Sequence, residues 1–321
     1  MTNILSTYPA TLPEALRRAA IDFPDKGIHI FDGRGRTVER RTYTEFWDLA
    51  LDHASRLRRL GIAKHEPVVV ALPTSWEWLI SWWGVLLSGG WPVAASGAGA
   101  IAAAEAQFDK VDTIMTTLGA RYVIASDGFR QQAGDHSFVW AAEGVLTLSE
   151  LGKLPKEANF RVGETAPEEV AFLQLTSGST GSPRAVMITH LGALHNAVAS
   201  SHAIGTPHGK PVHQFCDAMV SWLPLYHDMG LVGSLLLPIT TGLDVWLLRP
   251  PTFLARPNLW LEHLGAHGNT FVPSPNFGYQ LCVERVKPEK LEGVDLSGWK
   301  AALTGAEMIR PETVNAFIEK F

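Results

Sequence analysis

Cysteine is scarce in this sequence of 321 residues, and so are the spacings that hold metal ions. The two cysteines, Cys216 and Cys282, lie far apart, which fits buried thiols in a reducing cytoplasm rather than a disulfide framework. His213 lies shortly before Cys216, but the sequence has no second pair of this kind to complete a zinc site. We therefore expect a cytoplasmic protein with no metal site of its own.

Long apolar runs and an excess of positive charge are also missing. The first residues lack a basic region followed by an apolar core, so we expect no signal peptide. The tryptophan-rich segment 76–87 is only about a dozen residues long and contains Glu77, which is typical of a buried helix. The net charge is −5 and no basic stripe is present. We therefore expect neither a membrane span nor a nucleic-acid partner.

The sequence does contain short apolar strands that alternate with helices. Hydrophobic residues make up 46% of the chain and charged residues 18%, which fits a globular protein with a sizeable core. The alternation predicts an α/β fold with a parallel-rich sheet covered on both faces. Residues 127–167 are rich in loop-forming residues and predict little regular structure beyond 138–140 and 145–148. The expected helices lie at 12–20, 44–60, 76–87, 105–118, 191–202, 231–239, 257–267, 275–285 and from 311, and the expected strands at 28–31, 37–40, 67–72, 91–95, 122–125, 170–175, 185–188, 219–223, 245–248, 270–272 and 300–303.

Residues 176–184 form a polar loop between two of these apolar strands. They read Thr-Ser-Gly-Ser-Thr-Gly-Ser-Pro-Arg, and the glycines allow successive backbone N–H groups to point into one concavity. The hydroxyl groups and Arg184 add further donors, so the loop is suited to a polyphosphate. By composition alone it is equally an ordinary surface turn. It does not match the Walker pattern, and no early strand is followed by a dinucleotide-binding Gly-x-Gly-x-x-Gly.

Three stretches together resemble the adenylate-forming superfamily of acyl-CoA synthetases, peptide-synthetase adenylation domains and luciferases. They are the loop within 173–186, then Ser-Trp-Leu-Pro-Leu-Tyr-His-Asp-Met-Gly-Leu at 221–231, then Leu-Thr-Gly-Ala-Glu at 303–307. The second stretch, with Ser-Pro-Asn-Phe at 274–277, is most similar to the fatty-acyl-AMP ligase branch. The resemblance covers essentially the whole chain.

The resemblance implies the large N-terminal domain of that fold, an α/β structure of stacked mixed β-sheets flanked by helices in αβαβα layers. It implies one AMP-binding domain over 1–321, with a first α/β part at 1–165 and a nucleotide- and acyl-binding part at 166–321. Further family features are absent from the sequence: a Tyr-Gly-x-[Thr/Ala]-Glu motif, a ribose-binding Asp and a small C-terminal domain with a catalytic Lys. We therefore expect a fragment, incomplete at its C-terminus, with little ligase activity alone.

The implied activity is ATP-dependent activation of a carboxylic acid, most simply a fatty acid, in polyketide or lipid biosynthesis. ATP enters with Mg²⁺, acyl-AMP forms, pyrophosphate leaves, and the acyl group passes to the phosphopantetheine thiol of a carrier protein. Transfer to CoA, as in an acyl-CoA ligase, is the near alternative. An alternative of another class is a non-catalytic protein that binds nucleotide or acyl-adenylate, because Arg184 and Ala185 stand where the family usually has Lys and Gly.

The resemblance also assigns expected roles to individual residues. His227 would face the junction of the acyl carboxylate and the α-phosphate, although a single histidine outside this motif would more simply be structural. Asp228 is expected to cap the following helix. The expected catalytic residues are His227, Thr180 and Arg184; the phosphate-binding residues are Thr176, Ser177, Gly178, Ser179, Thr180, Gly181 and Arg184; the adenine-binding residues are Gly305, Ala306 and Glu307; and the acyl-pocket residues are Trp222, Met229, Gly230, Ser274, Asn276 and Phe277.

Overall fold

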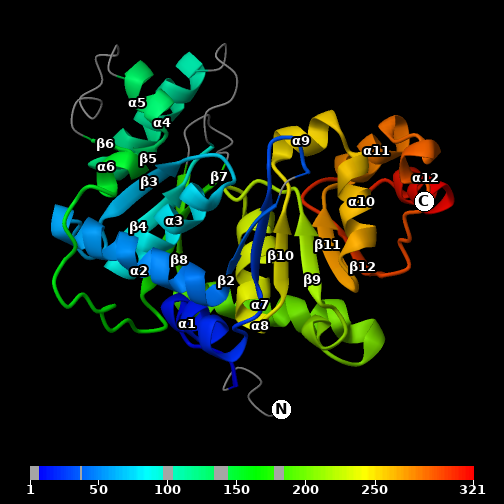
Figure 1. Cartoon of the computed structure of the whole chain (residues 1–321), viewed down its shortest axis with the longest axis horizontal. Helices are drawn as coiled ribbons and strands as arrows, with labels where there is room; N and C mark the ends of the chain where they lie inside the picture. Colours follow the sequence, from blue (N-terminus) through cyan, green and yellow to red (C-terminus); the bar gives the residue numbers. More distant parts are fainter. Residues whose placement is uncertain (1–6, 37, 97–103, 134–143, 177–183) are drawn as a thin grey trace. The chain divides into compact units, whose positions relative to one another are not determined.

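The computed structural model describes residues 7–36, 38–96, 104–133, 144–176 and 184–321. The chain forms two compact units, each built around its own six-stranded sheet (Figure 1). The first unit consists mainly of Arg18–Tyr43 and Leu194–Phe321, and the second of Ala10–Arg17 and Thr44–Ala193. The predicted α/β class, with mixed sheets flanked by helices, is confirmed.

The sheet of the second unit has the strand order β6-β5-β3-β4-β7-β8. Its neighbouring strands pair in parallel except β8, which is antiparallel to β7. The strands are β3 Pro67–Ala71, β4 Trp91–Ala94, β5 Tyr122–Ala125, β6 Val145–Leu146, β7 Val170–Thr176 and β8 Arg184–Thr189. The helices of this part of the chain are α1 Leu12–Asp22, α2 Tyr43–Leu60, α3 Trp76–Ser88, α4 Ala104–Leu118, α5 Asp127–Ala133, α6 Leu148–Leu151 and α7 His190–Gly205, of which α1, α2 and α7 extend across unit boundaries.

The tryptophan-rich segment is the buried helix α3, as predicted. Ser75 caps it, since its hydroxyl accepts a hydrogen bond from the Trp78 N–H, and Gly89 ends it in the left-handed conformation. The Trp82 ring is fully buried and packs edge-on against Phe172 of β7 at 5.4 Å between ring centroids. Across the ranges that the structure describes, we find no helix with the length and apolarity that crossing a bilayer requires.

The sheet of the first unit has the order β12-β11-β9-β10-β1-β2. All its neighbouring pairs are parallel except β1 and β2, and Figure 1 shows this hairpin beside β10 despite the distance in sequence. The strands are β1 Gly27–Phe31, β2 Val38–Thr42, β9 Ala218–Ser221, β10 Asp244–Leu247, β11 Thr270–Ser274 and β12 Trp299–Thr304. The helices are the 3₁₀ segments η3 Thr206–His208, η4 Val212–Gln214 and η6 Pro288–Leu291, the π-helix η5 Met229–Leu236, and α8 Leu237–Thr241, α9 Pro250–Ala255, α10 Asn258–Ala266, α11 Asn276–Arg285 and α12 Pro311–Lys320.

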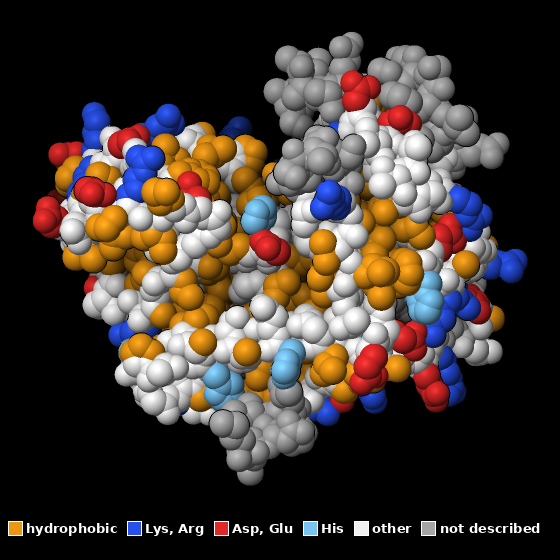
Figure 2. Space-filling view, turned by 180° about the vertical axis from the view of Figure 1, so that it is seen from behind, with side chains coloured by type: hydrophobic (Ala, Val, Ile, Leu, Met, Phe, Trp, Pro, Cys, Tyr) orange, Lys and Arg blue, Asp and Glu red, His pale blue; other side chains and the backbone are white. Residues whose placement is uncertain are grey.

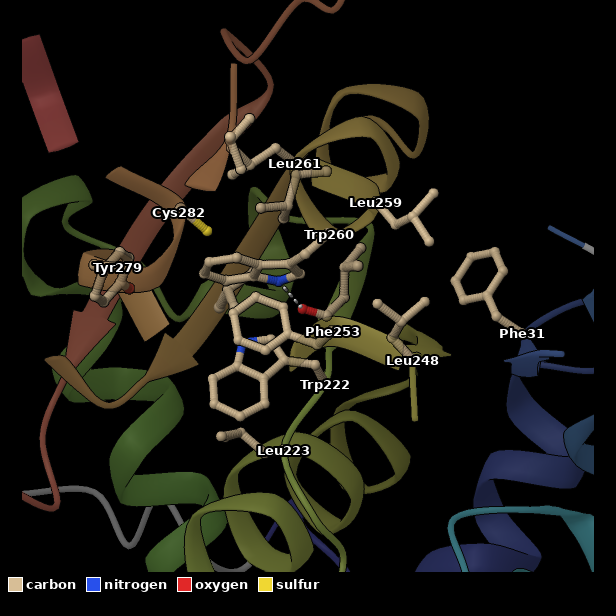
Figure 3. Packing of buried hydrophobic residues seen from close by; sticks show 14 of the residues in the cluster. Phe31, Trp222, Leu223, Leu248, Phe253, Leu259, Trp260, Leu261, Tyr279 and Cys282 are labelled. Atoms are coloured by element: carbon tan, nitrogen blue, oxygen red, sulfur yellow. Dashed lines mark hydrogen bonds between the residues drawn. The ribbon is translucent and has the colours of Figure 1, made fainter. Parts of the chain in front are cut away.

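Side chains of the first unit's strands alternate between two apolar clusters. Met219 of β9 packs in one cluster with residues of α7 and α8, whereas the adjacent Val220 packs in the other with residues of α9 to α12. The second cluster is rich in aromatic rings (Figure 3). Within it, the Trp260 indole N–H donates to the Val220 carbonyl at 3.3 Å. Both faces of this sheet are therefore covered, as the continuous apolar strands predicted.

The structure contains short helices that the sequence did not predict. Residues 127–167 contain α5 and α6 where mostly loop was expected, and the residues 138–140 lie outside the described ranges. The helix α6 depends on a capping box in which Thr147 and Glu150 satisfy each other's backbone N–H groups. The helix α9 begins at Pro250, a favourable first helical position that the sequence prediction did not use.

Candidate functional site

Two of the three motifs lie at one edge of the first unit's sheet. β9, β11 and β12 are parallel neighbours, so their carboxyl ends meet at the same edge. The motif at 221–231 follows β9, residues 274–277 follow β11, and the turn at 305–307 follows β12. Ligand sites of open α/β sheets lie at the carboxyl ends of the strands, so this edge is the candidate site.

His227 lies in the turn that follows β9, where backbone hydrogen bonds hold it on both sides. Its N–H donates to the Pro224 carbonyl at 3.1 Å, and its own carbonyl accepts from the Leu231 N–H at 2.8 Å. The imidazole Nδ1 lies 2.6 Å from Oδ1 of Asp228, and about half of the His227 side chain (53%) is accessible. An Nδ1–H donated to this carboxylate leaves Nε2 to accept a hydrogen bond when the ring is neutral, or to donate one when it is protonated.

Asp228 also begins the helix that follows, which confirms the predicted cap. Its Oδ1 accepts from the Met229 N–H at 2.6 Å. The segment Met229–Leu236 is a π-helix, where the sequence predicted an ordinary helix from Leu231. Gly230 explains part of this geometry, because a Cβ at this position would lie 2.2 Å from the Pro224 carbonyl oxygen. Only glycine permits so close an approach of the two backbones, and π-helical turns occur frequently at functional sites.

The expected acyl-pocket residues are divided between the core and the surface. The Trp222 ring is buried and stacks on Phe253 with centroids 4.0 Å apart, as Figure 3 shows. It meets the ring of Phe277 edge-on at 5.4 Å, and 42% of Phe277 is exposed. Ser274 is fully buried, and a Cβ on Gly278 would meet both its Oγ and the Trp222 ring. Trp222, Ser274 and Phe277 are therefore close together, and Phe277 offers apolar surface.

Two further expected site residues use their polar atoms within the protein. The amide of buried Asn276 accepts from the Arg310 N–H at 3.1 Å and donates to the Thr313 hydroxyl at 3.4 Å. Glu307 Oε1 accepts from the Phe277 N–H at 2.7 Å. These bonds attach the turn after β12 to the first turn of α11. The side chain of Glu307, expected at the adenine, thus holds the turn after β12 against α11.

Gly305 connects the second and third motifs. The atom nearest to a Cβ built on Gly305 is Met229 Cε, at 3.7 Å. Next to it, Thr304 has a buried hydroxyl oxygen with no hydrogen-bond partner among the described residues. The sequence prediction passed over Thr304, although its place at the end of a strand and directly before Gly305 could have singled it out.

The expected phosphate loop belongs to the second unit, and most of it lies outside the described residues. These are Ser177, Gly178, Ser179, Thr180, Gly181, Ser182 and Pro183. Thr176 and Arg184 flank it as a register pair of β7 and β8, which confirms the predicted hairpin. Both are exposed, and the Thr176 hydroxyl donates to the Arg184 carbonyl at 3.5 Å.

The sequence and the structure were compared with those of known proteins. Residues 16–321 match the family described as AMP-binding enzyme. The chain therefore belongs to the AMP-binding enzyme family. A putative acyl-CoA synthetase of Caulobacter vibrioides is 32% identical over 311 residues, which cover 97% of this chain and 52% of that protein.

Solved structures of AMP-binding enzymes resemble this one closely. A structure from a study of fatty acyl-adenylate ligases of E. coli and L. pneumophila matches with a TM-score of 0.87 and 33% identity, over 97% of this chain and 54% of that one. A fatty acyl-adenylate ligase of L. pneumophila in complex with acyl adenylate and pyrophosphate matches with a TM-score of 0.83 and 28% identity. The match covers 97% of this chain and 52% of that one. The chain thus has the fold of the N-terminal domain of adenylate-forming enzymes and spans about half the length of these relatives.

The two thiols of this AMP-binding chain lie in its interior. Both cysteines are buried, and burial raises the pKa of the Cys216 and Cys282 thiols to about 12, which keeps them protonated and unreactive. No group of three or more His, Cys, Asp or Glu side chains with metal-binding geometry occurs among the described residues. His227 and Asp228 form a polar pair at the candidate sheet edge.

Apolar surface is available at the same sheet edge as this pair. Figure 2 shows one face of the molecule, on which hydrophobic side chains form patches between charged ones. In the first unit, the side chains of Phe277, Met308 and Ile309 are well exposed, and Met308 reaches 82%. All three belong to the segments that follow β11 and β12, so the candidate site combines a polar pair with apolar side chains.

Proposed function

We propose that this chain is the nucleotide- and acyl-binding part of a ligase that activates a fatty acid as its adenylate. A carboxylate oxygen of the acid attacks the α-phosphorus of ATP, and the bond from that phosphorus to the oxygen bridging the β-phosphate breaks. Acyl-AMP forms and pyrophosphate leaves, with Mg²⁺ carried on the nucleotide phosphates. The reaction is mainly a task of positioning and charge stabilisation, so it needs oriented donors more than a nucleophilic side chain.

The observation that carries this proposal is the His227–Asp228 pair at the carboxyl end of β9. The carboxylate of Asp228 orients the imidazole, and when the ring is protonated its Nε2–H can donate to a carboxylate or phosphate oxygen. The turn 305–307 follows β12 at the same sheet edge and supplies a backbone surface for the adenine. The loop 176–184 would bind the β- and γ-phosphates through its backbone N–H groups, hydroxyls and Arg184.

We further propose that the acyl group passes to a carrier protein. The phosphopantetheine sulfur attacks the acyl carbonyl carbon, AMP leaves, and the thiol proton is released to solvent. The motif at 221–231 supports this branch, as does the similarity to fatty acyl-adenylate ligases. Similarity to a putative acyl-CoA synthetase supports CoA as the alternative acceptor, with the same first half-reaction.

The test of the first half-reaction is exchange of labelled pyrophosphate into ATP by the full-length protein that contains this sequence, measured with and without dodecanoic acid. We expect exchange that requires the acid. We expect His227→Ala to lower the exchange rate about a hundredfold, which is the usual effect of removing a positioned acid or base. His195→Ala is the matched control, because His195 is exposed on α7 in the same unit. Binding of ATP without any acid-dependent exchange would instead support the non-catalytic binder.

The acceptor is tested with the full-length protein that contains this sequence. Acyl transfer is followed by mass spectrometry to CoA and to a carrier protein with phosphopantetheine attached, at equal concentrations. Faster labelling of the carrier protein is the expected result. Efficient acyl-CoA formation would replace the carrier-protein assignment by the acyl-CoA ligase and leave the adenylation step untouched.

A further inference from the structure

Helix α11 begins without a cap from its own segment. The residue before it, Pro275, contributes no side-chain hydrogen bond, and the first N–H groups of any helix lack partners within the helix. Glu307 fills this role from a distant part of the chain, since its Oε1 accepts from the Phe277 N–H at 2.7 Å. A carboxylate is well suited to this place, because it meets the positive end of the helix dipole with a charge-assisted hydrogen bond.

Two further bonds join side chains of α11 to the backbone of the same segment. Asn276 accepts from the Arg310 N–H at 3.1 Å, and the Tyr279 hydroxyl donates to the Leu303 carbonyl at 2.8 Å. Leu303 precedes the turn 305–307 and Arg310 follows it. The turn is therefore fastened on both sides to one helical turn of α11. We refer to the three bonds from Asn276, Phe277 and Tyr279 as the α11 clamp.

Within the clamped turn, Ala306 has an unusual backbone conformation. Its φ is +65°, in the left-handed region that residues other than glycine rarely adopt. Alanine has no polar side chain that could offset this conformation with a local hydrogen bond, as asparagine does. Such a residue persists only where the surrounding structure forces it, and such outliers gather at ligand sites. The neighbouring Glu307 supplies one of the clamp bonds with its side chain, so Ala306 lies inside the clamped turn.

We infer that Glu307 is a positioning residue, which holds the backbone of Gly305 and Ala306 in the shape that receives the adenine of the nucleotide. The inference rests on the proposed function for the identity of the ligand. Glu307 acts through the N-terminus of α11 and needs no contact with the nucleotide itself. One oxygen of its carboxylate is already used within the protein, and Asn276, which forms another bond of the clamp, is buried.

The test combines binding with hydrogen exchange. Dissociation constants for AMP and for inorganic pyrophosphate are measured by calorimetry, and exchange of the Phe277 amide is measured without nucleotide by NMR. We expect Glu307→Ala to weaken AMP binding about tenfold, to leave pyrophosphate binding unchanged, and to speed Phe277 exchange about tenfold, the effect of losing one charge-assisted bond. Glu307→Gln keeps an acceptor oxygen and is expected to stay within about threefold on both measures.

Three further variants separate positioning from other roles. Asn276→Ala is expected to weaken AMP binding as Glu307→Ala does. Asn276→Asp keeps the acceptor for the Arg310 N–H and is expected to retain most of the affinity for AMP. Glu312→Ala is the control, because Glu312 is an exposed acid in the first turn of α12 and lies outside the clamp. The dissociation constant for AMP and the exchange rate of the Phe277 amide are both expected to be unchanged in Glu312→Ala.

The outcomes that contradict the inference are distinct from failure of the proposed function. If Glu307→Ala weakens AMP binding while Phe277 exchange stays at the wild-type rate, Glu307 contacts the nucleotide directly and the positioning role is wrong. The positioning role is equally wrong if Glu307→Ala binds AMP as tightly as wild type. If wild type itself does not bind AMP, the proposed function fails and the inference fails with it. Should Glu307→Ala not fold, Glu307→Gln and Asn276→Asp are compared in the same assays, and unchanged exchange with lost AMP affinity again overturns the positioning role.

Discussion

Nδ1 of His227 lies 2.6 Å from Oδ1 of Asp228, and the same oxygen accepts the Met229 N–H that begins the π-helix. One carboxylate oxygen thus orients the candidate catalytic ring and fixes the start of the next element. Asp228→Asn keeps an acceptor for the helix but removes the charge beside the ring. We expect the variant to fold normally and to lower acid-dependent pyrophosphate exchange about tenfold, because a charged hydrogen bond is worth about 1.5–3 kcal/mol. Exchange at the wild-type rate would show that the pair has no role in adenylation.

The second prediction concerns Gly230 in the π-helix. Gly230→Ala places a Cβ 2.2 Å from the Pro224 carbonyl oxygen, a backbone atom that cannot move aside easily. We expect a loss of about 1–3 kcal/mol in the free energy of unfolding, measured by denaturant titration, together with loss of exchange activity. Gly233→Ala is the matched control in the same π-helix, since its Cβ would have no neighbour closer than 3.9 Å. Equal stability of the two variants would contradict the close approach.

His53 predicts how acid affects the stability of the second unit. It is buried against Gly84 of α3, and burial lowers the pKa of its imidazole to about 4. The unfolded chain binds the proton near pH 6.5, so the contribution of neutral His53 is complete above that pH and is lost as the pH falls toward 4. At pH 4.5 the expected loss in the free energy of unfolding is about 2–3 kcal/mol relative to pH 7.5. His53→Leu should remove this part of the pH dependence, whereas exposed His195→Gln should not. Identical pH profiles for His53→Leu and wild type would contradict the assignment.

Arg184 tests the phosphate loop independently of the adenine turn. It ends the loop at the start of β8, where the family usually has lysine. We expect Arg184→Ala to weaken binding of ATP and of pyrophosphate about tenfold and to leave AMP binding nearly unchanged, the opposite selectivity to Glu307→Ala. Arg184→Lys should shift ATP affinity less, because it keeps the charge but not the planar guanidinium. The control is Arg161→Ala, an arginine in the same unit. ATP affinity that responds to neither Arg184 variant, nor to Thr180→Ala, would leave the loop without its proposed role.

Local signals in the sequence were sufficient to predict most of the helices and strands. Ser75 caps α3 and Asp228 caps the π-helix as their positions predicted, because a cap depends on groups within one turn of the residue. The hairpin around 176–184 and the parallel-rich sheets followed from continuous apolar strands. The capping box at Thr147 was equally local, but the sequence prediction did not use it, so α6 was not predicted.

The candidate site was only partly predictable for a different reason. The motifs indicated which residues to expect in it, and the sheet topology then brought two of them to one sheet edge. The partners of Asn276 and Glu307 could not be predicted, because each lies about thirty residues away in the sequence. The aromatic packing of Trp222 on Phe253 is likewise set by the meeting of β9 with α9.

The order of residues alone was enough to predict an α/β fold and most of its helices and strands, since periodicity and turn chemistry act over a few residues. The folded arrangement decided which polar groups meet. It placed the first turn of α11 against the segment after β12, gave Phe277 its acceptor in Glu307, and held Ala306 at a φ of +65°. It also brought Gly230 against Pro224 and so shaped the π-helix beside His227. The contacts of α11 join segments about thirty residues apart, and the close approach at Gly230 depends on the path of the folded backbone, so only the folded chain specifies them.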